Sequence, residues 1–218
     1  DPINVTINGN NGNDTITTPN GFIANFRGNV SVNGGGGTDT LFLDDSADAG
    51  NDTMTYSGGT FTKSDWSYAL TAIAHDNIVV QAGSGNNTIN LTNPNAFPTV
   101  RGGAGADIIN VEGSFVGVSN VIDGEAGLDS VAVNTDAVGT TPVRFANSQD
   151  LNLLNIGLGG FVVQNSGNLL LDVQSTIING RLDLSDGGFI DRAVAGENFY
   201  RTRLTTGYAG GAWTTAAQ

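Results

Sequence analysis

A short phrase recurs five times in this chain of 218 residues: glycine, any residue, Asp or Asn, any residue, then an aliphatic residue. The copies begin at Gly12, Gly37, Gly85, Gly105 and Gly127. Successive copies lie 25, 48, 20 and 22 residues apart, so the longest interval is close to twice the others. A period in the low twenties, with each turn phrase leading directly into a strand, predicts a stack of similar coils.

Short segments of alternating aliphatic residues flank these turns, such as Val30–Val32 before one corner and Leu41–Leu43 after it. Alternation places the aliphatic side chains on one face, and stacking successive coils buries that face as a continuous column. Glycine suits corners that need positive φ, and Asn or Asp can bond neighbouring backbone amides there. We therefore predict an all-β fold, a single parallel β-helix with coils of about 20–25 residues. Its right-handedness is expected from the general preference of parallel crossovers.

The domain organisation is predicted from the places where the repeat pattern changes. We predict a solenoid over residues 1–188, with an acidic and aromatic insertion at about 44–77. The interval of 48 residues fits two coils, the middle one carrying the variant phrase Gly50–Met54. Residues 189–218 hold clustered aromatic and arginine residues, with a short helix expected over 197–205. Because an open solenoid end exposes unpaired strand edges, we interpret this segment as the C-terminal cap.

The charge balance limits the classes of partner. The chain has 21 acidic and 8 basic residues, a net charge of −13, which argues against nucleic acids and anionic membranes. It has no cysteine, which excludes disulfides and thiolate chemistry, and no apolar run long enough to span a bilayer. No basic-then-apolar leader precedes Asp1, so an exported chain would have lost its leader or carry it outside this sequence.

Two groups of acids are candidate calcium ligands, because Ca²⁺ is bound by several carboxylate, amide and carbonyl oxygens. The first group comprises the turn acids Asp14, Asp39, Asp107 and Asp129, which stacked corners would align in one ladder. In the alternative interpretation, each of these acids only caps its own turn. The second group lies in the acidic loop and comprises Asp44, Asp45, Asp48 and Asp52.

The acidic loop places oxygens at alternate positions, as an EF-hand does, but it is not an EF-hand. Ala49 stands where that motif has glycine, and Thr55 stands where it has its bidentate glutamate. We predict a single ion site of no standard class here, with a solvated acidic loop as the alternative.

The turn phrases resemble the Gly-Gly-x-Gly-x-Asp-x-aliphatic nonapeptide of RTX-type calcium-binding proteins, which Gly34–Leu41 and Gly102–Ile109 match in full. RTX arrays repeat every nine residues, whereas the copies here lie a whole coil apart. The chain also resembles large extracellular β-helical proteins of planctomycete-type bacteria, through Leu43–Asp48, Leu182–Asp186 and the Gly207–Trp213 tail. The second resemblance covers most of the chain and implies an architecture and an extracellular location.

A carbohydrate-active role rests on two further sets of residues. Trp66 and Tyr68 lie one alternation apart and could stack on sugar rings, or could pack against the solenoid. A lyase needs a basic residue above calcium-holding carboxylates, and Lys63 lies near the acidic loop in sequence. His75 is the only histidine, and no nucleophilic triad can be built around it.

The most economical prediction is a non-enzymatic structural or adhesive protein of the cell surface or extracellular matrix, stabilised by calcium. The alternative is a glycan-binding or lyase-like module, and a third is a calcium-storing repeat. The first strand follows Asp1-Pro2 without an evident cap. We therefore expect self-association, or a neighbouring segment, to cover the N-terminal coil, and an extracellular glycan is the other expected partner. An N-terminal helix or loop folded over that coil in a monomer would contradict this expectation.

Overall fold

The computed structural model describes residues 3–92, 98–113, 120–134, 142–185 and 187–192. This part of the chain is nearly all β and forms a parallel β-solenoid of about eight turns. Two 3₁₀ helices, η1 (Pro19–Gly21) and η2 (Ile23–Asn25), lie between the first and second coils. The described residues contain no helix that is long and apolar enough to cross a membrane.

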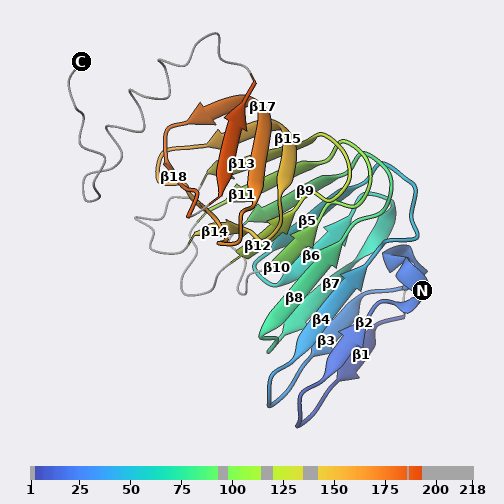
Figure 1. Cartoon of the computed structure of the whole chain (residues 1–218). Helices are drawn as coiled ribbons and strands as arrows, with labels where there is room; N and C mark the ends of the chain where they lie inside the picture. Colours follow the sequence, from blue (N-terminus) through green and yellow to red (C-terminus); the bar gives the residue numbers. More distant parts are fainter. Residues whose placement is uncertain (1–2, 93–97, 114–119, 135–141, 186, 193–218) are drawn as a thin grey trace, which may run out of the picture.

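Two sheets form the walls of the solenoid, and the chain passes from one to the other in each coil (Figure 1). The larger sheet contains, in spatial order, β1 (Val5–Asn8), β3 (Val30–Asn33), β7 (Trp66–Ile73), β6 (Thr60–Lys63), β5 (Thr53–Ser57), β9 (Thr88–Thr92), β11 (Ile108–Glu112), β13 (Asp129–Asn134), β15 (Gln149–Ile156), β17 (Leu170–Ile178) and β19 (Gly188–Asp191). The smaller sheet contains β18 (Arg181–Asp183), β16 (Phe161–Gln164), β14 (Val143–Phe145), β12 (Asn120–Asp123), β10 (Pro98–Arg101), β8 (Asn77–Gln81), β4 (Thr40–Asp44) and β2 (Thr15–Thr17).

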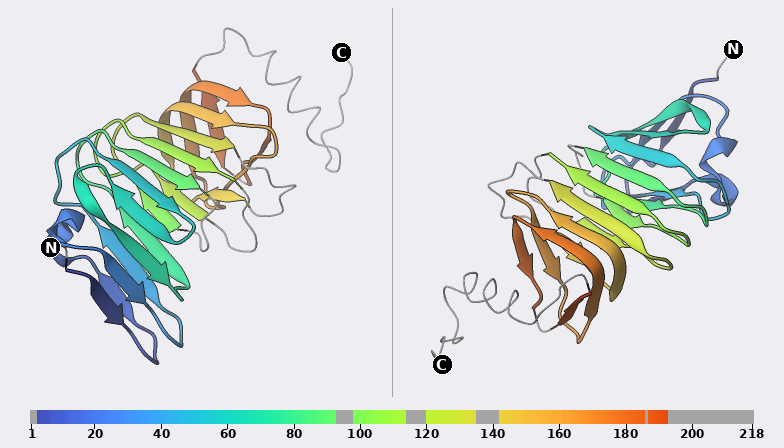
Figure 2. Two further views of the ribbon diagram at one scale, coloured as in Figure 1. Left: turned by 180° about the vertical axis from the view of Figure 1, so that it is seen from behind. Right: turned by 90° about the horizontal axis from the view of Figure 1, so that it is seen from above.

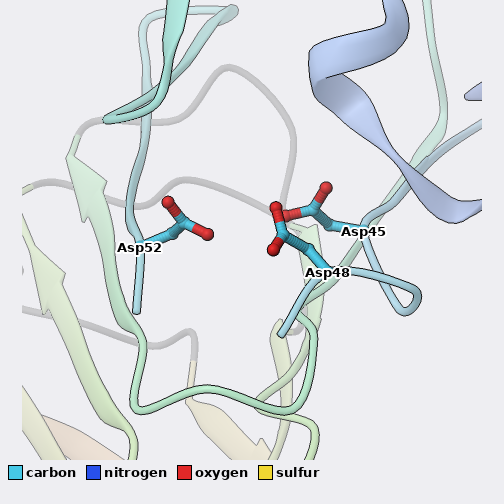
Figure 3. A group of neighbouring side chains, drawn as sticks. All are labelled: Asp45, Asp48 and Asp52. Atoms are coloured by element: carbon cyan, nitrogen blue, oxygen red, sulfur yellow. The ribbon is translucent and has the colours of Figure 1, made fainter. Parts of the chain in front are cut away.

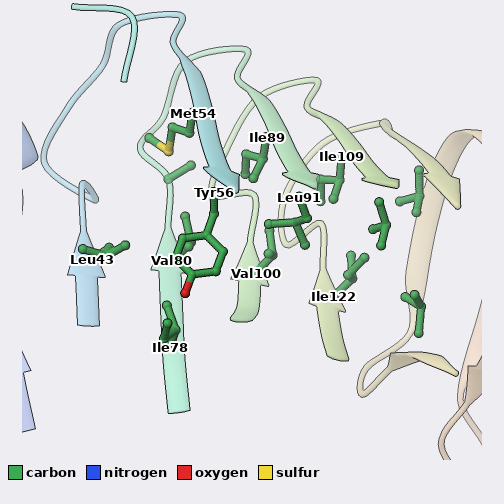
Figure 4. Packing of buried hydrophobic residues seen from close by; sticks show 14 of the residues in the cluster. Leu43, Met54, Tyr56, Ile78, Val80, Ile89, Leu91, Val100, Ile109 and Ile122 are labelled. Atoms are coloured by element: carbon green, nitrogen blue, oxygen red, sulfur yellow. The ribbon is translucent and has the colours of Figure 1, made fainter. Parts of the chain in front are cut away.

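Strand alternation buries one apolar row from each sheet, as the sequence predicts. On the larger sheet, parallel pairing aligns a column from coil to coil: Met54, Ile89, Ile109, Val131 and Leu154. On the smaller sheet the corresponding column is Leu43, Val80, Val100, Ile122 and Phe145. These side chains are fully or almost fully buried. Figure 4 shows those from Met54 to Ile109 on one wall facing those from Leu43 to Ile122 on the other. Each buried aliphatic side chain stabilises the fold by about 1.5–3 kcal/mol.

The segment between β4 and β8 forms one enlarged coil, so the prediction of two coils is wrong. β4 pairs directly with β8 in the smaller sheet, while β5, β6 and β7 form an antiparallel meander within the larger sheet. Gly58 and Gly59 both have positive φ, 54° and 83°, and connect β5 to β6. Two successive positive-φ residues give the tight turn that reverses a strand into a hairpin, so the chain folds back instead of advancing by a coil.

The two ends of the solenoid lie far apart along the stack (Figure 2). β1 and β2 are the edge strands at one end, and β19 and β18 are the edge strands at the other. β19 pairs in parallel with β17, so the solenoid continues to Asp191, past the predicted boundary at residue 188. The rest of the predicted cap, including the helix expected over 197–205, lies outside the described residues.

Candidate functional site

The Gly-x-Asp turns fall on two opposite edges of the solenoid, not on one. Asp14 and Asp39 precede strands of the smaller sheet, whereas Asp107 and Asp129 lead into strands of the larger sheet. The turn phrase changes from one edge to the other at the variant phrase Gly50–Met54. There Asp52 follows Asp39 by 13 residues, which is about half a coil. The single ladder of turn acids that the sequence predicts is therefore two separate ladders.

Three of the turn acids, Asp39, Asp107 and Asp129, cap the turn of the preceding coil. The Asp14 amide donates to Asp39 Oδ1 at 2.9 Å, and the Asp39 amide donates to Asp76 Oδ2 at 2.8 Å. On the opposite edge, the amides of Asp52, Asn87 and Asp107 donate to Asn87 (3.0 Å), Asp107 (2.7 Å) and Asp129 (2.8 Å) in turn. These bonds satisfy backbone amides at the corners, where the strand ladders end. The bonds thus join neighbouring coils, which a cap within its own turn would not do.

The second position of the phrase makes bonds in the opposite direction. The side-chain oxygens of Asn13, Asn51 and Asn86 accept the amides of Thr38 (2.9 Å), Asn86 (2.8 Å) and Ala106 (2.9 Å) in the next coil. The first position must be glycine where coils approach closely. Gly127 has φ +145°, and a Cβ there would lie 1.6 Å from the Gly105 carbonyl oxygen. The first three positions of the phrase therefore have a structural role in joining coils.

The ladder acids are deeply buried. Asp39, Asp107 and Asp129 are each 1% exposed, and the Oδ2 atoms of Asp14, Asp39 and Asp107 have no hydrogen-bond partner among the described residues. Burial raises the pKa of Asp107 and of Asp129 to about 6. The hydrogen bond from the Asn87 amide to Asp107, and that from the Asp107 amide to Asp129, lower these pKa values but do not outweigh burial. Such carboxylates suit a structural role, and their charged form is disfavoured in the folded protein.

One group of described acids has the spacing of metal ligands: Asp45, Asp48 and Asp52, whose ligand atoms lie within 4.8 Å of one another. Figure 3 shows Asp45 and Asp48 side by side, with Asp52 facing them. One oxygen of each is held in place, by the Ile23 amide on Asp45 (3.0 Å), the Gly50 amide on Asp48 (2.8 Å) and the Ser64 hydroxyl on Asp52 (3.0 Å). This buried triad could hold a metal ion.

A cation of the protein itself already lies among these acids. Lys63 Nζ lies 2.6 Å from Asp48, 3.0 Å from Asp45, 3.0 Å from Asp52 and 2.9 Å from Asp65. The Lys63 side chain is fully buried, and Lys63 is the only lysine of the chain. We call Lys63 and these four acids the Lys63 cluster.

Burial and pairing compete in setting the pKa values of the Lys63 cluster. Burial lowers the pKa of Lys63, but the bonds to the four carboxylates outweigh it and raise the pKa above its ordinary value. Burial also raises the pKa of Asp45, whereas the bond from Lys63 lowers the pKa of the more exposed Asp48. Four carboxylates thus surround one ammonium group.

Comparisons of the chain with protein-family models, with curated proteins and with solved structures found no match. The resemblances to RTX-type and planctomycete-type proteins therefore stay predictions.

The fourth acid predicted in the acidic loop lies apart from the Lys63 cluster. Asp44 ends β4 in the row that points away from the core, and its Oδ1 accepts the Ser46 amide at 3.0 Å. Lys63 was considered beside these acids only as the basic residue of a lyase-like site, because it lies near the acidic loop in sequence. Asp65 and Asp76 were not predicted as partners.

Trp66 and Tyr68 pack into the solenoid. Trp66 is 5% exposed, its Nε1 donates to the Phe26 carbonyl at 2.6 Å, and its ring meets Tyr68 edge-on at 6.2 Å. This burial favours a packing role for Trp66, and sugar binding by the pair stays a prediction. His75 is half-buried, and its Nε2 lies 3.2 Å from the Val32 carbonyl oxygen.

A shallow depression of about 310 Å³ crosses several coils at the corner edge. Its floor consists mainly of small residues, and Ser46, Gln81 and Glu125 are its longer polar side chains. Gln81 donates to Glu125 at 3.0 Å, so these two groups already bond to each other. Neither Trp66 nor Tyr68 lines this depression.

Proposed function

We propose that the protein is a non-enzymatic structural or adhesive solenoid of the cell surface or extracellular matrix. The observation that carries this proposal is the bonding of the buried acidic side chains. The acids of the two ladders bond to backbone amides of neighbouring coils, and those of the Lys63 cluster bond to the buried Lys63. These bonds hold the coils together, and rigidity is what a scaffold requires.

The N-terminal end supports association with a further coil. Asp14 occupies the position whose Oδ1 accepts the amide of a preceding coil at Asp39, Asp107 and Asp129. β1 and β2 are the edge strands of their sheets, and Ile3 and Val5 are 69% and 38% exposed. Unpaired parallel edges of this kind pair readily with another strand. We propose that a coil of a second copy, or of a neighbouring segment, covers this end.

The scaffold role predicts association that depends on the first strand. We expect the molar mass from light scattering to rise with protein concentration, and Ile3→Lys with Val5→Lys to suppress this rise. Leu158→Lys is the matched control, because Leu158 is 87% exposed in the turn between β15 and β16, far from β1 and β2. A monomer at every concentration would refute self-association. Depolymerisation of acidic or neutral polysaccharides would instead favour the carbohydrate-active alternative.

Calcium is the ion that this all-oxygen triad would take. Because Lys63 Nζ occupies the space among Asp45, Asp48 and Asp52, we expect the wild-type melting temperature to be the same in calcium and in EDTA. The variant Lys63→Met removes the competing cation, and its melting temperature should rise with calcium but not with magnesium. Differential scanning fluorimetry measures both. A wild-type response to calcium equal to that of Lys63→Met would show that Lys63 does not exclude the ion.

A further inference from the structure

The setting of Lys63 is unusual for a lysine. Lysine is almost never fully buried in proteins unless it is paired, and this chain places its single lysine with no exposed side-chain surface. In β6, Lys63 lies opposite Met54 of β5 and Trp66 of β7, which are both buried. The amine thus reaches the carboxylates from within an apolar part of the core.

We propose that Lys63 and Asp48 form a covalent cross-link, an amide between Lys63 Nζ and Asp48 Cγ. Asp48 Oδ2 is the carboxylate oxygen nearest to Nζ, at 2.6 Å. Asp48 Oδ1 accepts the Gly50 amide at 2.8 Å, which fixes the carboxyl group and offers a donor to an oxyanion on that atom. The inference does not depend on the proposed scaffold role.

The reaction balances without any other reactant. The ammonium gives one proton to Asp48 Oδ2, 2.6 Å away, against the ion pairing that holds the pKa of Lys63 high and that of Asp48 low. Contact at this distance offsets that cost, and the neutral amine attacks Cγ, so that the C–N bond forms and negative charge moves to Oδ1. Nζ gives a second proton to Asp45, whose Oδ2 lies 3.0 Å away and is fully buried. Asp45 passes this proton to the Oδ2 hydroxyl, the C–O bond breaks, and water leaves. The amide keeps one N–H, both protons of the water come from Nζ, and Asp45 is regenerated.

The fold holds the Lys63 amine and the Asp48 carboxyl group in contact, which favours this condensation. Reacting groups held at contact distance in a water-poor site react as if at very high concentration. The hairpin turn between β5 and β6 returns Lys63 to the corner, 15 residues after Asp48. The cross-link would close this stretch into a ring that includes all of β5. Because the chain has no cysteine, no disulfide can cross-link this stretch instead.

Intact-mass measurement of the full chain in denaturant tests the proposal directly. We expect the folded and then denatured protein to weigh one water molecule less than its sequence. Because the chain has one lysine, an amine-reactive reagent applied in denaturant should label the N-terminus and no side chain. A full sequence mass together with complete labelling of Lys63 would overturn the cross-link and leave an ion cluster only.

Variants assign the partners. Lys63→Arg and Asp48→Ala should show the full sequence mass. Asp65→Asn should keep the loss of water, because Asp65 is 47% exposed at the margin of the cluster. Asp45→Asn, which removes the proton relay, should form the bond more slowly after refolding while reaching the same native spectrum. Fragmentation of the wild-type peptide should place the bond on Asp48, and a bond to Asp45 or Asp52 would overturn that assignment. The wild-type mass decides the proposal even if a variant fails to fold.

Discussion

Replacement of Lys63 with methionine is expected to lower the free energy of unfolding by about 3–5 kcal/mol in EDTA. Methionine keeps most of the apolar stem but removes Nζ from among Asp45, Asp48 and Asp52, whether Nζ is a free ammonium group or part of the proposed amide. Those acidic side chains are 0%, 16% and 6% exposed, so water cannot replace the lost group fully. An unpaired buried charge costs far more than a surface pair contributes. Urea unfolding followed by tryptophan fluorescence measures the change, with Trp66 as a nearby reporter.

Two further variants make this result specific to the Lys63 cluster. Arg181→Met removes a cation whose side chain is 68% exposed and stacks on Phe161, and we expect a loss of about 1 kcal/mol or less. Lys63→Met combined with Asp45→Asn and Asp52→Asn should regain part of the lost stability, because fewer charges remain uncompensated. If Lys63→Met cost no more than Arg181→Met, the cluster would not be a stabilising feature.

Stability is expected to fall as the pH rises from about 4 to about 7. Asp107 and Asp129 have pKa values raised to about 6 by burial, so the folded chain binds more protons in this range than the unfolded chain. Their contribution is complete below the ordinary value of 3.8 and is lost as the pH passes through about 6. A shift of about two units corresponds to about 3 kcal/mol for each group. Denaturation midpoints across this pH range measure the loss.

The ladder itself supplies the control for this pH dependence. Asn87 holds an equivalent position, where its Oδ1 accepts the Asp52 amide and its Nδ2 donates to the Gly85 carbonyl at 2.8 Å. Asp107→Asn and Asp129→Asn should therefore keep the coil-to-coil bonds, stabilise the protein at pH 7 and flatten its pH profile. Asn87→Asp should do the reverse. A steep profile that survives in the double asparagine variant would place the pH-sensitive groups elsewhere.

The coil architecture could be predicted because each coil carries its own local information. Turn phrase, alternation and period all indicated parallel stacking, and the buried columns through Ile89 and Val80 are the aliphatic positions of that alternation. The enlarged coil could not be counted correctly from spacing alone. The interval of 48 residues adds one coil enlarged by a hairpin to the half coil by which the phrase changes edge, and this sum equals two ordinary coils. The Gly58-Gly59 turn marks the hairpin through its two positive φ values.

The site was harder to predict than the fold because its chemistry depends on contacts between segments. The acids of the 45–52 loop were identified as cation ligands, but their cation comes from β6 after a chain reversal. Likewise, the acids Asp14 and Asp107 have the same local phrase yet lie on opposite edges. A half-coil interval of 13 residues between Asp39 and Asp52 was the visible sign of that exchange.

The enlarged coil also determines how straight the molecule can be. Three strands separate β3 from β9 in the larger sheet, whereas β8 alone separates β4 from β10 in the smaller sheet. At a spacing of about 4.8 Å per strand, one wall gains about 10 Å over the other at this level. Such a wedge tilts the axis of the stack at one fixed height. A partner that follows one wall therefore meets a convex surface, and a partner on the opposite wall meets a concave one.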